Sequence, residues 1–212
     1  YFSSGWGSGM DNQPRMQPGF DFRRGHGFMS WIDITLQQVY VGKLLVKIAG
    51  VLGREQEVKN IQEEVDRLSV FVNTNMWDEN DAFYYDRYRD GELSHLKTVG
   101  AYWALLAGIV PEKRKGDFIA HLSNPNEFAR QHRVPSWTAN NPDYNPNGGY
   151  WRGAVWAPTT YMVLRGLTVN GQDSLADAIA PNHLNQVVEV FGKTGTFWAN
   201  YAPDRVHGNN RK

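Results

Sequence analysis

Long loops rich in glycine, asparagine and proline alternate with pairs of apolar helical stretches along this chain, and the alternation occurs three times. In the first pair, apolar residues recur every three or four positions over 36–51 and again over 58–72, with Gly53 between them. This spacing predicts two amphipathic helices joined by a short turn. The chain is therefore expected to be all-α and built from helical hairpins.

The second and third predicted pairs follow the same plan. Residues 99–106 predict one helix of the second pair, and Pro111 opens the other, since proline is favoured in the first turn of a helix. The third pair covers about 153–167 and 172–191, and Pro181 is expected to break or kink its last helix. Because each pair follows a long loop, we expect the loops to gather on one rim and to build a site there.

A short β-hairpin is predicted between the first and second helix pairs, over 82–91, with Asp90-Gly91 at its turn. Several oxygen-bearing residues in and before this stretch resemble a calcium-binding cluster, namely Asp78, Asn80, Asp81, Asp86 and Asp90. They lack the central glycine and the final glutamate of a calcium loop. We therefore interpret them as a solvated hairpin and predict no metal site.

The composition excludes several classes of function. Lys plus Arg and Asp plus Glu each total 22, so no net charge favours a nucleic-acid or anionic-membrane partner. The chain has no cysteine, which excludes disulfides and thiol chemistry but leaves the cellular compartment open. No apolar run is long enough to span a membrane. Eight tryptophans, within an aromatic content of 13%, favour a flat, hydroxyl-rich ligand such as a carbohydrate.

The familiar motifs of cofactor sites and catalytic nucleophiles are absent. The glycines over 5–9 do not fit the spacing of a dinucleotide-binding loop, and no predicted strand precedes them. No serine has glycine two positions before and two after it, and no histidine pair has the spacing of a zinc helix. We therefore predict no cofactor. What remains is a set of loop carboxylates among arginine and aromatic residues, of which Asp11 lies in a glycine-rich and proline-rich turn.

Five segments, in order and over nearly the whole chain, resemble the group of inverting glycoside hydrolases that contains trehalases, family sixty-three processing α-glucosidases and mannosylglycerate hydrolases. Ser8–Arg15 resembles the general-acid motif of this group, S-G-[WM]-D-x-[SQ]-x-R. Gly149–Trp156 is similar to the segment Y-W-R-G-[PA]-[VI]-W. The other matching segments are His26–Asp33, Lys97–Gly108 and Thr194–Tyr201, the last of which falls where the family has T-G-x-F-W-E-[NK]-Y.

The resemblance implies an (α/α)6 toroid, in which six helical hairpins surround an axis and the sugar site lies at one end. The three predicted hairpins correspond to about half of such a toroid, together with one small β-hairpin. We therefore expect residues 1–212 to be part of a single toroid catalytic domain, with an N-terminal half and a final helix absent from this chain. An open arc would expose apolar helix flanks, so we expect self-association or binding to a complementary half of the toroid.

The resemblance also implies an inverting mechanism, in which a carboxylic acid protonates the leaving oxygen and a carboxylate activates water on the opposite face of the sugar. Asp11 matches the position of the acid. Arg15 and Arg152 match polar residues that line the site and donate hydrogen bonds to sugar hydroxyls. Five tryptophans are expected to offer stacking faces to an oligosaccharide or glycoside substrate: Trp6, Trp31, Trp151, Trp156 and Trp198.

The chain departs from the family pattern at the general base. Ala199 occupies the position where the family has glutamate, and a methyl group accepts no proton. No neighbour replaces the carboxylate, since Asn200 is an amide and Asp204 lies five residues further along. We therefore expect a fragment or variant of an inverting α-glucosidase or α-mannosidase whose hydrolysis is impaired.

Two other functions are compatible with the sequence. One is a carbohydrate-binding remnant that retains the pocket and has lost catalysis, and the other is a helical-hairpin interaction module that binds no sugar. The substrate also stays open, because trehalose, glucosylglycerate, mannosylglycerate and gluco-oligosaccharides all fit the motifs. Binding to a panel of these sugars separates the interaction module from the other two functions.

Overall fold

A computed structural model describes residues 8–15, 20–21, 26–27 and 29–205 of the chain. Most of the regular structure in these ranges is helical. The α-helices are α1 (Ile32–Val51), α2 (Lys59–Asn75), α3 (Trp103–Leu106), α4 (Glu112–Ala120), α5 (Ala157–Thr168) and α6 (Asp173–Thr194). Short 3-10 helices form η3 (Glu55–Val58), η4 (Val99–Tyr102) and η5 (His121–Ser123).

The strands in the described ranges are each two residues long and form antiparallel pairs. The pairs are β1 (Phe20–Asp21) with β2 (His26–Gly27), β3 (Met29–Ser30) with β6 (Arg87–Tyr88), β4 (Trp77–Asp78) with β5 (Phe83–Tyr84), and β7 (Val155–Trp156) with β8 (Asn200–Tyr201). None of the described helices has the length and apolar character needed to cross a membrane. The expectation of a mainly helical chain is confirmed, and the described residues contain several small strand pairs where one β-hairpin was predicted.

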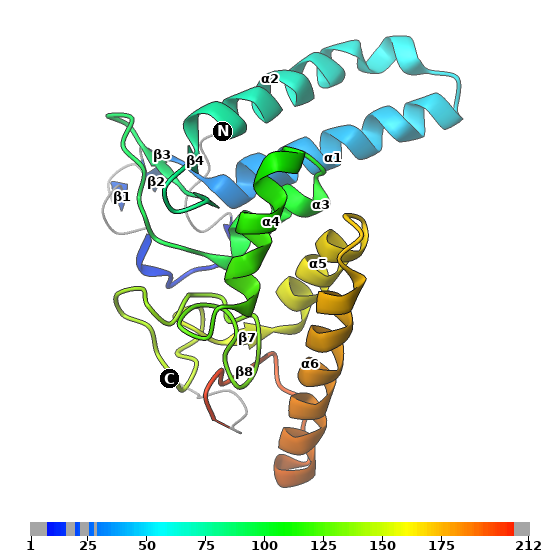
Figure 1. Cartoon of the computed structure of the whole chain (residues 1–212). Coiled ribbons are helices and arrows are strands. Elements are labelled where there is room, and N and C mark those ends of the chain that lie inside the picture. The colour runs from blue at the N-terminus through cyan, green and yellow to red at the C-terminus, as the bar shows by residue number, and fades with distance from the viewer. Residues whose placement is uncertain (1–7, 16–19, 22–25, 28, 206–212) are drawn as a thin grey trace.

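The three predicted helix pairs are present. Figure 1 shows α1 and α2 side by side as a long antiparallel hairpin, and α5 and α6 as the last pair. Gly53 has φ +66°, a left-handed conformation that glycine adopts without steric cost, and it ends the turn after α1. In the shorter middle pair, the ring of Phe118 on α4 stacks on Tyr102 with 4.8 Å between centroids.

The helices of the three pairs form an arc. α1 contacts α3, and α3 contacts α5, so these helices form one continuous row. α2 packs against α1 and α6 packs against α5. The long loops leave this helical framework at one end, where the segment 8–15, the loop 123–152 and residues 195–205 lie near one another (Figure 1). The expectation that long loops gather on one rim is therefore met by the described residues.

The predicted β-hairpin over 82–91 is wrong in its pairing. β5 pairs with the preceding strand β4, with Trp77 opposite Tyr84, while β6 pairs with the distant strand β3. The Asp78 carboxylate accepts hydrogen bonds from the backbone N–H groups of Asn80 and Asp81, both at 2.8 Å, which closes the turn between β4 and β5. The turn at Gly91 does form, with φ +101°.

Of the two effects predicted for Pro181, a break or a kink in the last helix, the break is wrong, since α6 is continuous from Asp173 to Thr194 with Pro181 inside it. Proline removes one backbone donor and leaves the carbonyl four residues earlier without its helical partner. That carbonyl belongs to Asp177, which lies on the exposed side of α6, where water can hydrate it. The cost of the missing hydrogen bond is small at such a position.

The core is rich in aromatic residues. Phe83, Tyr102, Phe118 and Phe128 are fully buried, and their rings meet at centroid distances between 4.8 and 6.1 Å. These rings come from a strand, the middle helix pair and the long loop. The aromatic core therefore holds the loop end of the arc to the helices, beneath the rim.

A glycine permits the close approach of α1 and α2. A Cβ atom added at Gly42 would collide with the Cγ2 methyl of Val65 on α2. Val65 is buried and has a branched side chain with little freedom to move. Gly50, by contrast, lies on the same helix, is exposed and has open space around it.

We expect Gly42→Ala to lower the free energy of unfolding by about 1–3 kcal/mol, because the helices must separate to fit the methyl group. Gly50→Ala is the matched control and is expected to stabilise the chain by about 0.5–1 kcal/mol, since alanine is a better helix former than glycine. Urea denaturation measures both values. Equal effects of the two substitutions would show that the α1–α2 contact is loose.

Candidate active site

The turn that carries Asp11 is well defined by its backbone. Gly9 has φ +74°, and the Gln13 N–H donates to the Met10 carbonyl at 3.1 Å. The Ser8 hydroxyl oxygen accepts a hydrogen bond from the Met10 N–H at 3.1 Å. Met10 is buried, whereas the Asp11 side chain is exposed at the tip of the turn. The turn thus presents a carboxyl group to solvent from a fixed backbone.

Gln13 anchors the turn from below. Its amide nitrogen donates to the carbonyl of Ser136 at 2.8 Å, and the side chain is buried. Its amide oxygen accepts hydrogen bonds from Arg15 Nε at 2.7 Å and from the Thr98 hydroxyl at 3.2 Å. One side chain therefore links the Asp11 turn to the long loop and to the start of η4.

Arg15 lies fully buried beneath the turn. Its guanidinium contacts Asp33 at 2.6 Å and both carboxylate oxygens of Asp86 at 2.9 and 3.0 Å. The Trp31 ring lies under the guanidinium, 5.2 Å from its carbon to the ring centroid, and Trp31 is fully buried as well. In this structure, Arg15 and Trp31 offer no surface to a sugar, in contrast to the direct contacts expected from the sequence.

The buried charges around Arg15 shift one another's pKa. Burial alone would lower the pKa of Arg15, but the carboxylates of Asp33 and Asp86 more than offset this effect and raise it. Burial also raises the pKa of Asp86, an effect that Arg15 opposes. Asp86 is thus a buried ion-pair partner, which corrects its interpretation as part of a solvated hairpin. The described residues contain no group of three or more side chains able to hold a metal ion.

The segment 149–151 holds the Asp11 turn from the other side. The Tyr150 hydroxyl donates to Asp11 Oδ2 at 3.1 Å. Asn12 donates to the Gly149 carbonyl at 3.1 Å and accepts from the Trp151 N–H at 2.9 Å. These hydrogen bonds join residues almost 140 positions apart in sequence. Two of the family-like motifs therefore meet at Asp11.

A stacked pair of tryptophans lies next to this contact. The rings of Trp151 and Trp156 are nearly parallel, with centroids 4.1 Å apart and an angle of 6° between planes. Trp151 is buried and Trp156 is half-buried, and the Tyr150 ring packs edge-on against Trp156 at 5.2 Å. The outer ring of the stack is thus the one with accessible surface.

The β7–β8 pair brings the end of the chain to the same place. Asn200 lies opposite Trp156 and Tyr201 lies opposite Val155. Ala199, immediately before β8, is exposed. Trp198 is half-buried, and its indole N–H donates to the Thr194 hydroxyl at 3.1 Å. The position that the motif resemblance matches to the family's general base therefore directly precedes a strand that pairs with Trp156 of the stack.

Arg152 forms an ion pair with the long loop. Its guanidinium contacts Asp143 of the long loop at 3.0 Å, and about 41% of its side chain is exposed. Of the predicted site residues, the structure brings together Asp11, Trp151, Trp156 and the segment containing Trp198 and Ala199, and it leaves Arg152 accessible beside them. Trp6 lies outside the described residues.

Sequence reasoning assigned no role to Tyr150 or Asn12, although Tyr150 belongs to the Y-W-R-G-like segment. Tyr150 has φ +63°, an uncommon conformation for a bulky residue, of the kind that concentrates at functional sites. Partial burial and the hydrogen bond to Asp11 raise the pKa of Tyr150. The paired glycines 148 and 149 before it are the only signal of an unusual backbone at this point.

A histidine pair supports the loop that follows Ala199. His132 Nε2 and His183 Nδ1 are 2.8 Å apart. The backbone N–H of His132 donates to the Pro203 carbonyl at 2.8 Å. Asn182, next to His183 on α6, donates from its side-chain amide to the Gln131 carbonyl at 2.9 Å and so binds the long loop 123–152, to which His132 also belongs. Burial, and to a lesser extent the charge of His183, lower the pKa of His132 to about 3. The imidazole pair thereby ties α6 to the long loop, and the backbone of His132 ties the long loop to the loop that follows Ala199.

Residues 1–209 match the family described as the mannosylglycerate hydrolase MGH1-like glycoside hydrolase domain. The match covers nearly the whole chain, and the chain belongs to this family of glycoside hydrolases. A probable mannosyl-oligosaccharide glucosidase of Schizosaccharomyces pombe is 24% identical over 221 residues, which is 97% of this chain and 27% of the relative. The chain is thus related to glucosidases but spans little more than a quarter of this one.

Two groups of solved structures share the fold. The mannosylglycerate hydrolase of Thermus thermophilus, in complex with Tris, matches with a TM-score of 0.74 and 24% identity, over 85% of this chain and 42% of that one. Neutral trehalase of Saccharomyces cerevisiae matches with a TM-score of 0.72 and 16% identity, over 91% and 37% of the two chains. The chain therefore has the (α/α)6 toroid fold that the motifs predicted and corresponds to about two fifths of these enzymes, where the three helix pairs predicted about half of a toroid.

The low pKa of His132 predicts acid sensitivity. Unfolded histidine has a pKa near 6.5, so below this pH the unfolded chain binds a proton that the folded chain excludes. The stability contributed by neutral His132 is complete above about pH 6.5 and is lost as the pH falls toward 3. Between pH 6.5 and 5, we expect a loss of at most about 1.4 kcal/mol per pH unit from this residue, measured by urea denaturation.

His132→Asn should reduce this slope, because the titrating group is gone. Asn182→Ala removes a neighbouring anchor of the same loop and no titrating group, so it should lower stability at every pH and keep the parental slope. A parental slope in His132→Asn would mean that other groups cause the acid sensitivity.

Proposed function

We propose that this chain forms the acid-bearing part of an inverting α-glycoside hydrolase site, within a single toroid catalytic domain to which residues 1–212 belong. The observation that carries the proposal is the meeting of three distant segments. Asp11 is exposed on a fixed turn, Tyr150 donates to it, and the Trp151–Trp156 stack lies beside it. The β7–β8 pair adds position 199 to the same cluster.

In this proposal, Asp11 is the general acid, and its free oxygen protonates the glycosidic oxygen as the bond to the anomeric carbon breaks. Tyr150 and Asn12 are positioning residues, since they hold the carboxyl group and its turn through hydrogen bonds of 2.9–3.1 Å. Arg15 does not contact the sugar and supports the Asp11 turn indirectly, by neutralising the buried carboxylates beneath it. A water molecule on the opposite face of the sugar would attack the anomeric carbon and release its proton to surrounding water, because Ala199 offers no carboxylate to accept it.

Binding of the sugar is assigned to the aromatic and polar groups on the rim. Trp156 and Trp198 are half-buried, which leaves ring surface for stacking on a pyranose face. The indole N–H of Trp156 and the amide nitrogen of Asn200 are buried and have no hydrogen-bond partner within the described residues. Such donors favour a polar ligand nearby. Arg152 would add a charged donor at the margin of the cluster.

Ala199 favours a second candidate function, carbohydrate binding without efficient hydrolysis. No carboxylate stands at this position to remove the proton from the attacking water, and the side chain is exposed. A site that keeps its stacking rings and donors would still hold a sugar. Names of similar proteins suggest the sugars to test first: mannosylglycerate, trehalose and glucosylated mannose oligosaccharides.

The test restores the missing carboxylate. We expect the chain to bind at least one of these sugars by calorimetry and to hydrolyse it poorly. Ala199→Glu should increase hydrolysis by about 10²–10⁴, the usual effect of one positioned base, and product analysis should show inversion. Ala199→Gln is the matched control, because glutamine has the same shape and accepts no proton from water.

Asp11→Asn in the Ala199→Glu background should remove the gain again, more strongly for substrates with poor leaving groups. If Gln and Glu at position 199 behave alike, the base lies elsewhere. If no sugar of the panel binds, the glycosidase proposal is contradicted and the interaction-module function is favoured.

A further inference from the structure

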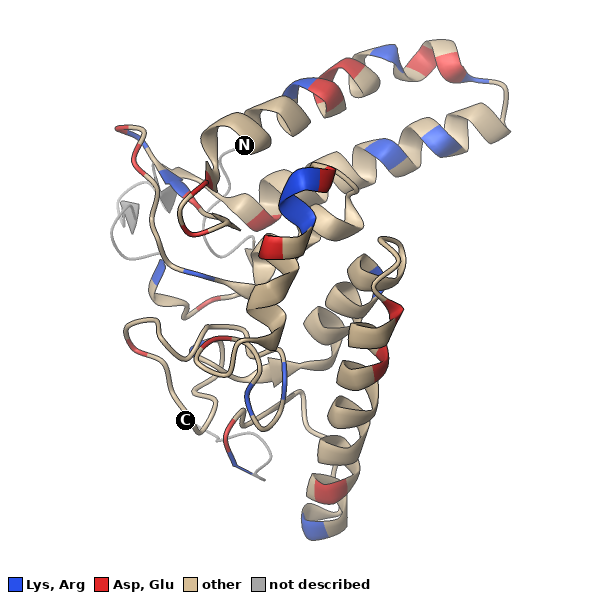
Figure 2. Cartoon of the chain, in the orientation of Figure 1, with Lys and Arg blue, Asp and Glu red and all other residues tan. Residues whose placement is uncertain are grey.

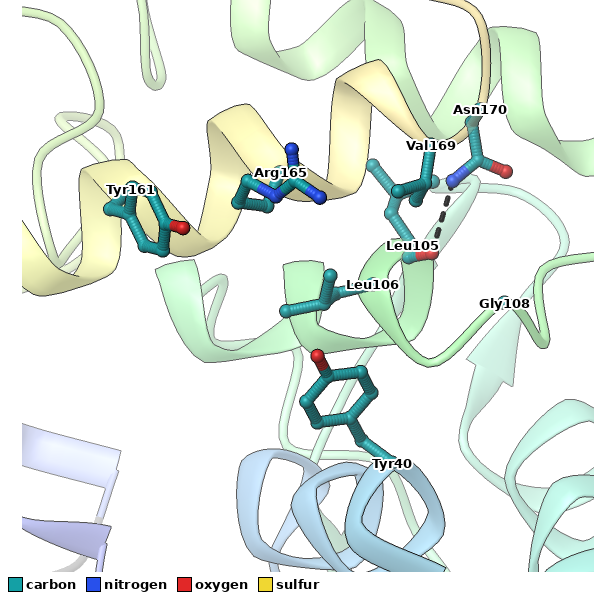
Figure 3. Close-up of a pocket in the computed structure, with 8 residues that line it drawn as sticks. All are labelled: Tyr40, Leu105, Leu106, Gly108, Tyr161, Arg165, Val169 and Asn170. Atoms are coloured by element: carbon teal, nitrogen blue, oxygen red, sulfur yellow. Dashed lines mark hydrogen bonds between the residues drawn. The ribbon is translucent and has the colours of Figure 1, made fainter. Parts of the chain in front are cut away.

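A groove runs along the open side of the helical arc, away from Asp11. Its floor is Leu105 and Leu106 of α3, and its walls are α1 and α5 (Figure 3). It encloses a cavity of about 370 Å³. We define the α1–α3–α5 groove by the residues that line it: Tyr40, Leu105, Leu106, Tyr161, Arg165 and Val169.

Apolar side chains extend the α1 wall of the groove far beyond the cavity. From Tyr40, residues on the same helix face follow at Leu44, Ile48 and Val51, and Ile48 is 54% exposed. On the other wall, Tyr161 and Arg165 of α5 and Val169 directly after its end follow one another at four-residue intervals, and Tyr161 is 66% exposed. Each helix thus presents a stripe with the spacing that another helix would bury. Exposed stripes of this kind mark interaction surfaces.

The groove is also basic and contains no acid. Lys47 on α1 and Arg165 on α5 are exposed and form no ion pair within the described residues. Lys43 is already engaged, since its ammonium donates to the Ala107 carbonyl at 2.6 Å. Figure 2 shows basic residues and no acidic residue on α1 beyond its first turn. It shows no acidic residue on α5 either. The acid in the first turn of α1, Asp33, is buried against Arg15.

We propose that the α1–α3–α5 groove binds amphipathic helices that carry carboxylates. These helices would belong to helical hairpins other than the three of this chain. The fold supports helices as the occupant, because the chain corresponds to about two fifths of a toroid in which such hairpins close the arc. The charges disfavour a second copy, which would place Lys47 and Arg165 against another basic groove face. Like charges brought together suppress such pairing.

Two peptides test the proposal on the chain as it exists. Both are fluorescently labelled amphipathic helices of about 20 residues, with leucine at every third or fourth position. One carries glutamate beside the leucine stripe and the other carries lysine at the same positions. We expect the glutamate peptide to bind at least about tenfold more tightly in fluorescence anisotropy.

The preference should depend on the groove cations. The double variant Lys47→Glu with Arg165→Glu should lose or reverse it, while sugar binding at the Asp11 site stays unchanged. The control Lys113→Glu makes the same kind of charge reversal on the exposed side of α4 and should retain the preference. Retention in all variants, equal binding of both peptides, or binding of neither would overturn the proposal.

Self-association is measured in parallel by sedimentation velocity. A monomer, or a dimer that Ile48→Asp leaves intact, agrees with a groove that is free for a different partner. A dimer that Ile48→Asp dissociates and the glutamate peptide fails to displace would show that the groove pairs with a second copy, which contradicts the proposal. Because the Asp11 site and the groove are assayed with different ligands, either proposal can fail without the other.

Discussion

The fully buried guanidinium of Arg15 is the interaction on which the arrangement of the rim depends. A charge without solvent is tolerated only when it is paired, and Arg15 meets the carboxylates of Asp33 and Asp86 within 3.3 Å. Asp33 belongs to the first turn of α1, while Asp86 lies between β5 and β6 and accepts a hydrogen bond from the Ile32 N–H at 2.8 Å. One cation therefore joins the Asp11 turn, the longest hairpin and the small strands.

A series of hydrogen bonds between neutral groups connects Arg15 to the rim. Gln13 accepts from Arg15 and donates to Ser136, whose N–H donates to the Ala154 carbonyl next to β7. β7 pairs with β8 and so fixes the strand that begins directly after Ala199. Asn12 completes this series by accepting a hydrogen bond from the Trp151 N–H. The buried charges thus position the Asp11 turn and the segment that contains Ala199, although the charged groups themselves are not accessible from the surface.

The helices were predictable because their apolar spacing is local, as the bounds of α1 and α2 show. The strand pairing was not, since β3 and β6 lie almost 60 residues apart and each has only two residues. The motif match placed Asp11, Trp151, Trp156 and Ala199 in one cluster. It also suggested sugar contacts for Arg15 and Trp31, which are buried here, because a motif records residue types and does not distinguish a ligand contact from support beneath it.

Hydrogen exchange tests most directly whether Arg15 organises the rim. In Arg15→Met, the amide protons of Gln13 and Trp151, which are bonded to the Met10 carbonyl and to Asn12, should lose protection relative to the parent chain. Amides in the middle of α2 should keep the protection they have in the parent chain, because that helix packs on α1 away from the charges. Unchanged protection at Trp151, or an equal loss throughout α2, would contradict a specific role for the buried cation in holding the site together.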